Sequence, residues 1–140
     1  EDLAGAVATL QRAVAINADY AEGFVLIGTA LNQLGRHGEA IDPLQQATRL
    51  EAKNADAHYR LSEAHLGIGG FRAAVQAGKR AVNLRREFHA AQVVLADAHY
   101  KLGEVDEARR YYTAAVSDSR FKDYCQHQLD EIDRPQEGGQ

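Results

Sequence analysis

Histidine is the residue of this sequence best suited to metal binding or acid–base chemistry, and six are present. His58 and His65 are spaced as two turns of one helix, and His99 stands 34 positions after His65. No Asp or Cys accompanies them at the spacing of a zinc site. Leu31 lies 34 positions before His65, so an apolar residue occupies the same place one interval earlier. We therefore interpret these histidines as packing residues and expect neither a metal site nor a cofactor.

Glycine and serine also lack the surroundings that catalysis would require. Gly67, Gly69 and Gly70 follow a helical pattern instead of a strand, and no Lys-Ser/Thr pair follows them, as a phosphate-binding loop demands. No serine stands in a nucleophile elbow. The sequence therefore predicts no enzymatic activity.

The bulk properties narrow the class of protein. A formal net charge of -4 and a pI near 5.8 argue against nucleic-acid binding, which normally needs a basic domain. No apolar run approaches the roughly 20 residues that cross a bilayer. The single cysteine, Cys125, permits no internal disulfide and is typical of a reducing compartment. We expect a cytoplasmic protein or a soluble part of a larger one.

One interval of 34 residues organises the chain. Residues 21–54 hold two helical patterns separated by a glycine, and residues 55–88 and 89–122 repeat them. A helical hairpin of this kind cannot cover both of its apolar stripes alone, so it is stable only when a similar hairpin stacks on it. The recurring positions are Ile27, Leu61 and Leu95; Ala30, Ala64 and Ala98; Gly35, Gly69 and Gly103; Ala40, Ala74 and Ala108; and Ala47, Ala81 and Ala115.

These residues resemble the tetratricopeptide repeat (TPR), whose signature is a large residue, a Leu-Gly pair, a Tyr-like residue and two later alanines. The best match is Phe24, Ile27, Gly28, Leu31, Ala40 and Ala47. The resemblance covers about nine tenths of the chain and is closest to bacterial TPR arrays. It implies an all-α fold, an α-solenoid in which antiparallel helix pairs stack as a right-handed superhelix.

We expect one TPR domain over residues 1–134, and the two ends of the repeat pattern indicate how it begins and ends. Residues 1–20 match the second helix of a repeat whose first helix is missing, so we expect the sequence to be excised from a longer array. Residues 123–134 read as a capping helix with a polar outer face. Residues 135–140 are expected to form a disordered tail.

In TPR arrays the first helix of each unit lines an inner groove, and the resemblance places the candidate peptide-binding residues there. The groove is mildly acidic and carries two tyrosines, which favours a peptide with Lys or Arg beside apolar residues. The alternative is that its acidic residues serve only solubility. The implied groove residues are Val25, Thr29, Asn32 and Gln33 from the first unit, Tyr59, Glu63 and Leu66 from the second, and Val93, Asp97, Tyr100 and Lys101 from the third.

A chaperone carboxyl-tail receptor is not expected. TPR grooves that hold such tails use a Lys and an Asn on one first helix and basic residues on a later one. The matching places here hold Val25 and Thr29, then Ala90 and Val94.

The second helices present a mostly basic outer face, which we interpret first as a solvated surface. Contact with an acidic partner or an anionic surface is the alternative. The basic residues are Arg49, Lys79, Arg80, Arg85, Arg86, Arg109 and Arg110.

Gly78 replaces the Leu44 and Tyr112 of the neighbouring units. It either admits a closer approach of two helices or leaves a soft spot, in which case Gly78→Ala would stabilise the protein by about 0.5 to 1 kcal/mol.

The sequence as a whole predicts a protein-interaction scaffold without catalysis of its own, which binds a peptide or partner protein in the groove. A second hypothesis is an accessory arm that recruits substrate for a larger enzyme or assembly factor. A third is self-association through the apolar stripe of residues 1–20, giving a homo-oligomer.

Overall fold

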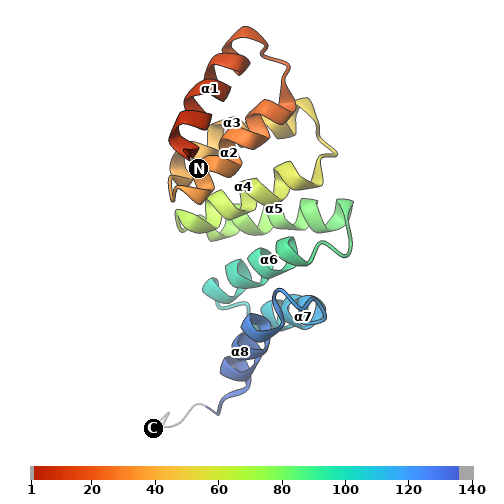
Figure 1. Ribbon diagram of the computed structural model, residues 1–140. Coiled ribbons are helices and arrows are strands. Elements are labelled where there is room, and N and C mark those ends of the chain that lie inside the picture. The colour runs from red at the N-terminus through yellow and green to blue at the C-terminus, as the bar shows by residue number, and fades with distance from the viewer. Residues whose placement is uncertain (1, 136–140) are drawn as a thin grey trace.

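The structure is a computed structural model that describes residues 2–135, so positions 136–140 of the expected tail lie outside the described residues. The described range is helical throughout, with short turns between the helices, and the helices stack along one axis (Figure 1). The helices are α1 (Leu3–Ile16), α2 (Ala21–Gln33), α3 (His37–Leu50), α4 (Ala55–Gly67), α5 (Phe71–Leu84), α6 (His89–Lys101), α7 (Val105–Ala115) and α8 (Lys122–Asp133).

Glycines at the 34-residue interval form the turn inside each of three helix pairs. Gly35, Gly69 and Gly103 have φ values of 74°, 79° and 77°, in the left-handed region that glycine enters without steric cost. In the first pair the turn is closed by the amide of Arg36, which donates to the carbonyl of Leu31 over 2.8 Å. The same sequence signal thus ends α2, α4 and α6 and reverses the chain into α3, α5 and α7.

Small residues hold the two helices of each pair close together. The alanines that recur in the second helices have no exposed surface, so the partner helix packs directly over them. These alanines are Ala40, Ala47, Ala74, Ala81, Ala108 and Ala115.

Consecutive helix pairs pack mainly through the second helix of one pair and the first helix of the next, α3 with α4 and α5 with α6, and the first helices also contact one another. α2 packs against α4 and α4 against α6, whereas within residues 2–135 the second helices α3, α5 and α7 do not pack closely on one another. Splaying of the second helices curves the stack, which makes α2, α4 and α6 the inner layer and α3, α5 and α7 the outer layer. The described chain is an α-solenoid, as the repeat pattern predicts.

Much of the apolar stripe of α1 is buried against other helices of the same chain. Val7 is buried in one cluster with α2 and α3 residues, and Leu3, Leu10 and Val14 are half-buried against the same cluster. The stripe that the sequence suggests as a self-association surface is therefore largely covered by α2 and α3. Ile16, at the end of α1, remains 89% exposed.

The third pair departs from the repeat at its end. α7 stops at Ala115, although the repeat pattern, in which α3 ends at Leu50 and α5 at Leu84, would carry it to Asp118. The side chain of Asp118 accepts hydrogen bonds from the backbone amide of Arg120 at 2.9 Å and from its guanidinium, a turn that competes with helix. These bonds lower the pKa of Asp118 to about 2. The turn then leads into α8, where the sequence predicts a capping helix.

Gly78 lies at a close approach of α5 and α6. A β-carbon at this buried position would lie 3.3 Å from both Cβ and Cδ1 of Leu95, which has no exposed surface. The missing side chain therefore lets the two helices pack closely, which favours the first of the two interpretations.

Candidate functional site

The residues predicted for the groove all lie on α2, α4 and α6, the helices of the inner layer. The structure gathers four of them around one hollow of about 450 Å³, lined by residues from α4 to α8. These four are Leu66, Asp97, Tyr100 and Lys101, and we call the hollow the inner pocket. Its remaining walls are Gly67, Gly69, Phe71, Tyr112, Tyr124 and Gln128.

Asp97 is the centre of the hydrogen bonds in the inner pocket. The Tyr124 hydroxyl, from α8, donates to Oδ1 of Asp97 over 2.8 Å, and the Tyr112 hydroxyl, from α7, donates to the same oxygen. The two tyrosine rings meet edge to face at 6.3 Å. No residue of the described range donates a hydrogen bond to Oδ2. One oxygen of the carboxylate is thus committed to holding three helices together, and the other is available to a ligand.

Burial sets the protonation behaviour of this group. Removal from water raises the pKa of Asp97 above its ordinary value, although the two tyrosine hydroxyls and the charge of Lys101 act in the opposite direction. Burial and the neighbouring carboxylate raise the pKa of Tyr124 to about 12 and that of Tyr112 above its usual range. Both tyrosines therefore stay protonated at neutral pH and act as donors.

The carboxylate of Glu63 is less available than the sequence suggests. Nη1 of Arg60 pairs with its Oε2 at 3.0 Å, and the Tyr59 hydroxyl donates to its Oε1 at 3.3 Å. Arg60 also lies over the Tyr59 ring, 4.9 Å from its centroid. The prediction of an acidic groove needs correction, because Arg60 offsets Glu63 and Lys101 stands beside Asp97.

Asn32, one of the predicted groove residues, takes part in helix packing. Its side chain is buried, its amide nitrogen donates to the Arg60 carbonyl over 3.0 Å, and its oxygen lies 3.0 Å from Nδ1 of His37. These bonds tie α2 to α4 and α3. The sequence could not show this, because the partners are a backbone carbonyl 28 positions away and a residue of another helix.

The other predicted groove residues lie outside the inner pocket. Val25 and Thr29 are half-buried on α2, where the Thr29 hydroxyl donates to the Val25 carbonyl over 2.8 Å. Tyr59 packs on the Phe88 ring at 5.0 Å between centroids. Val93 is half-buried against residues of α7 and α8. Gln33 is exposed at the end of α2.

Sequence reasoning missed the residues that α7 and α8 add to this site. The ring of Tyr112 is buried, and its hydroxyl reaches Asp97. Tyr124 occupies the repeat position of Ala90. The available signal was in both cases a departure from the repeat, a tyrosine where another unit has a smaller residue.

Two of the histidines belong to the packing of the helices. His58 and His99 are buried, and the His99 ring stacks on Tyr111 at 5.8 Å with the planes 6° apart. Within residues 2–135 no group of three His, Cys, Asp or Glu side chains is arranged to hold a metal ion. The same part of the chain contains no helix that is both long and apolar enough for a bilayer.

Two family models match the repeat region of the sequence. One, described as "TPR repeat", matches residues 28–69, and the other, described as "Tetratricopeptide repeat", matches residues 59–122. The two overlap and together span residues 28–122, most of the helical stack. The chain belongs to the tetratricopeptide repeat family.

Curated TPR relatives are longer than this chain. The chain is 29% identical over 84 residues to small glutamine-rich tetratricopeptide repeat-containing protein 2 of Mycosarcoma maydis, a match that covers 60% of this chain and 24% of that protein. It is 32% identical over 93 residues to DnaJ homolog subfamily C member 7 of Mus musculus, covering 61% and 18%. The chain thus spans a quarter or less of the relatives it matches.

Solved TPR structures share the fold. A crystal structure of MamA superposes with a TM-score of 0.88 at 23% identity, covering 94% of this chain and 77% of that one. The type III secretion translocator chaperone SycD of Yersinia enterocolitica superposes with a TM-score of 0.74 at 17% identity, covering 84% and 94%. At these identities the likeness concerns the fold alone.

Proposed function

We propose that this TPR chain is a protein-interaction module without catalysis of its own, and that it binds an extended peptide segment of a partner along the inner layer. The observation that carries the proposal is the inner pocket with its available carboxylate oxygen. A concave site with apolar walls and a few directed polar groups is the form that ligand sites commonly take in proteins.

The pocket is suited to one long basic side chain of the peptide. Leu66, Phe71 and the Tyr100 ring offer apolar contact for an aliphatic stem, and Oδ2 of Asp97 offers an acceptor for the charged head. Lys101 lies at the same pocket and disfavours a second cation beside the first. We therefore expect one Lys or Arg flanked by apolar residues, and not a polybasic stretch.

Selection from a displayed library of random peptides tests this proposal. The selected peptides should share a single basic residue next to apolar ones, and their affinity should be measured by fluorescence anisotropy. Asp97→Asn keeps an oxygen that accepts both tyrosine hydroxyls but removes the charge, so we expect it to weaken binding about tenfold. Gln76→Ala, a control at an exposed position of the outer helix α5, should change the affinity less than about twofold.

Two results would contradict the proposal. One is that selection yields no sequence motif. The other is that Asp97→Asn and Tyr100→Ala bind the selected peptides as tightly as the original chain.

A second candidate is that the module recruits a substrate or client for a larger protein. It is favoured by the length of the relatives, of which the matched segments form only 24% and 18%. If it is correct, deleting this segment from a longer parent chain should reduce action on the partner protein but leave action on a small model substrate unchanged.

A further inference from the structure

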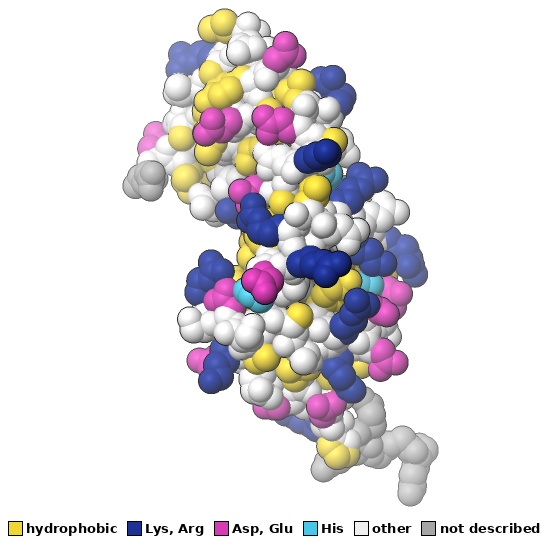
Figure 2. Space-filling model, turned by 90° about the vertical axis from the view of Figure 1, so that its right-hand side faces the viewer, with side chains coloured by type: hydrophobic (Ala, Val, Ile, Leu, Met, Phe, Trp, Pro, Cys, Tyr) yellow, Lys and Arg dark blue, Asp and Glu magenta, His cyan; other side chains and the backbone are white. Residues whose placement is uncertain are grey.

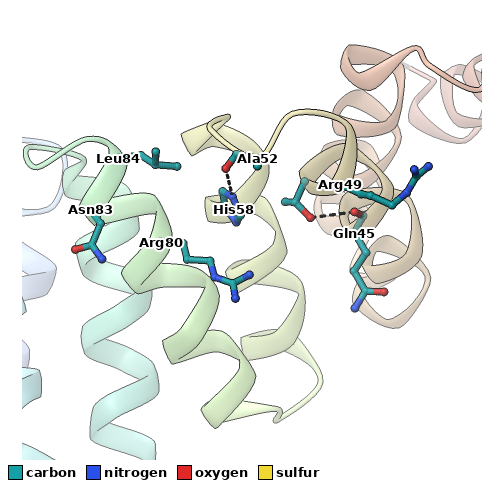
Figure 3. Close-up of a pocket in the computed structure, with 8 residues that line it drawn as sticks. Gln45, Arg49, Ala52, His58, Arg80, Asn83 and Leu84 are labelled. Carbon is teal, nitrogen blue, oxygen red and sulfur yellow. Dashed lines mark hydrogen bonds between the residues drawn. The ribbon is translucent and has the colours of Figure 1, made fainter.

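The outer layer contains a crevice between consecutive helix pairs, shown in Figure 3. It has a volume of about 540 Å³, and α3, α4 and α5 contribute its walls. Its charged residues are Arg49 and Arg80, its neutral polar residues include Gln45 and Asn83, and no Asp or Glu lines it. We call it the first outer crevice.

The same crevice recurs one pair further along. The second outer crevice has a volume of about 660 Å³ and lies between α5, α6 and α7. Its charged residues are Arg86 and Arg110, and Asn83 lines both crevices. Again no lining residue is acidic.

His58 in the first crevice and Gln92 in the second occupy the same position of the repeat, and each makes a hydrogen bond to the loop before its helix. Nε2 of His58 lies 2.8 Å from the Ala52 carbonyl, and one repeat later the Gln92 amide donates to the Arg86 carbonyl over 2.9 Å. Each of these bonds holds the loop before a first helix against that helix. The crevices are thus built by the repeat itself and are fixed in position, while the arginines around them are particular to this chain.

Few carboxylates lie near the arginines of the crevices. Within the described chain, Arg49, Arg80 and Arg86 have no carboxylate within 4.0 Å, and Arg110 has only a 3.9 Å contact with Glu107. The Arg49 guanidinium is turned outward and donates to the neutral Gln46 amide oxygen at 2.8 and 3.0 Å. Figure 3 shows Arg80 reaching from α5 toward α4. A carboxylate would be a stronger acceptor than either the amide or water for both groups.

The positive charge of the two crevices contrasts with the chain as a whole, which is acidic, with a net charge of -4. Figure 2 shows Lys and Arg side chains gathered on one face at the height of the central helices. By contrast, Arg109 on the outer helix α7 is paired with Asp133 at 2.7 Å. Each crevice thus presents arginine charge that is not neutralised by a lining carboxylate.

We propose that the outer layer is a second interaction surface, distinct from the inner pocket, and that it binds an acidic extended segment of a partner protein. Carboxylates of the segment pair with Arg80 in the first outer crevice, with Arg49 at the outer edge of that crevice, and with Arg86 and Arg110 in the second. The amide of Asn83, between them, donates to the backbone of the segment. Complementary charge both steers the encounter and fixes the register of such a complex.

The probe for this surface is a fluorescein-labelled peptide of about 12 residues that alternates Glu and Ser, long enough when extended to span two repeats. The matched probe replaces every Glu with Gln. Anisotropy at about 50 mM salt should show binding of the Glu probe and at least about tenfold weaker binding of the Gln probe. Arg49→Gln/Arg80→Gln should weaken binding of the Glu probe about fivefold or more.

The control variant is Arg12→Gln/Arg72→Gln, which removes two exposed positive charges from positions that line neither crevice. It should change the affinity less than about twofold, and thermal unfolding should show that both variants fold. Asp97→Asn should leave binding of the Glu probe unchanged, which separates this surface from the inner pocket.

Three results would overturn the proposal. The crevice variant could bind the Glu probe as well as the original chain does. The control variant could lose as much affinity as the crevice variant, which would show general electrostatics. A single-stranded oligonucleotide of similar charge could bind more tightly than the Glu probe, which would make the surface a nucleic-acid site.

Discussion

The hydroxyl of Tyr124 on α8 lies 2.8 Å from Oδ1 of Asp97 on α6 and donates to it. α8 also packs on α6 and α7 through an apolar cluster that joins Val93 and Ala96 to Cys125, and the bond from Tyr124 fixes α8 beside the inner pocket. The carboxylate therefore has two roles, one in the fold and one offered to a ligand.

The two roles can be separated by substitution at Asp97. Asp97→Asn retains an oxygen for both hydroxyls and removes a buried charge, so at neutral pH the free energy of unfolding should change by less than about 1 kcal/mol. Asp97→Leu leaves the buried Tyr112 hydroxyl without its acceptor and should cost about 1 to 3 kcal/mol. Urea unfolding followed by circular dichroism measures both. Equal losses for the two variants would contradict this account of the hydrogen bonds.

The dependence of stability on pH follows from the same group. Burial raises the folded-state pKa of Asp97 above its unfolded-state value, so the folded chain binds more protons between the two pKa values. The contribution of Asp97 is therefore fully present below the unfolded-state pKa of about 3.9 and is lost as pH rises through the folded-state pKa. The free energy of unfolding of the original chain minus that of Asp97→Asn should fall as the pH is raised from about 4 to neutrality.

Taking this difference between the two chains removes the contribution of Asp118, whose pKa is lowered to about 2 and whose effect has the opposite sign. A difference that stays constant with pH, or that grows as the pH rises, would contradict the raised pKa of Asp97.

Three glycines of helices should respond differently to replacement by alanine. At Gly28 a β-carbon would overlap the buried Leu44 side chain, so Gly28→Ala should cost about 2 kcal/mol or more. At Gly78 the contact with Leu95 is only tight, and the higher helix propensity of alanine, about 1 kcal/mol, offsets most of the strain. Gly38→Ala is the matched control, because its β-carbon would meet Ile68 at an ordinary 3.9 Å, and it should stabilise the chain by about 0.5 to 1 kcal/mol. Thermal unfolding should rank the variants in this order.

The thiol of Cys125 should be unreactive in the folded chain. It has no exposed surface, and burial raises its pKa to about 11, so little thiolate forms at neutral pH. A colourimetric disulfide reagent should therefore label it within minutes in about 6 M guanidinium but only at the rate of unfolding in buffer. Fast labelling of the folded chain would show that α8 detaches from α7.

The architecture could be predicted from the sequence because each feature of it depends on residues at one fixed interval. Gly35, Gly69 and Gly103 mark the turns, and the recurring alanines mark the contacts inside each pair. Such signals are local and are repeated three times, so a departure in one copy, such as Gly78 for Leu44, does not hide them.

The site was predicted less completely, because its decisive contacts join positions that do not repeat. Asp97 was identified as an inner residue, but its partners come from α7 and α8, 15 and 27 positions away. The early end of α7 and the turn at Asp118, which place Tyr124, have no counterpart in the other pairs. Side-chain pairing also limited one inference, since Arg60 pairs with Glu63 and leaves Asp97 as the carboxylate on which the expected basic ligand depends.

The central claim is that the inner pocket binds a peptide. The most direct test is to add a selected peptide to the ¹⁵N-labelled chain and to find which amides respond. In two-dimensional NMR spectra, the largest changes in amide chemical shift should fall on α4, α6 and α8 around Leu66, Asp97, Tyr100 and Gln128. Asp97→Asn should reduce them at the same peptide concentration. Changes centred on α3 and α5 instead, or no saturable change at a peptide concentration of about 1 mM, would contradict the account.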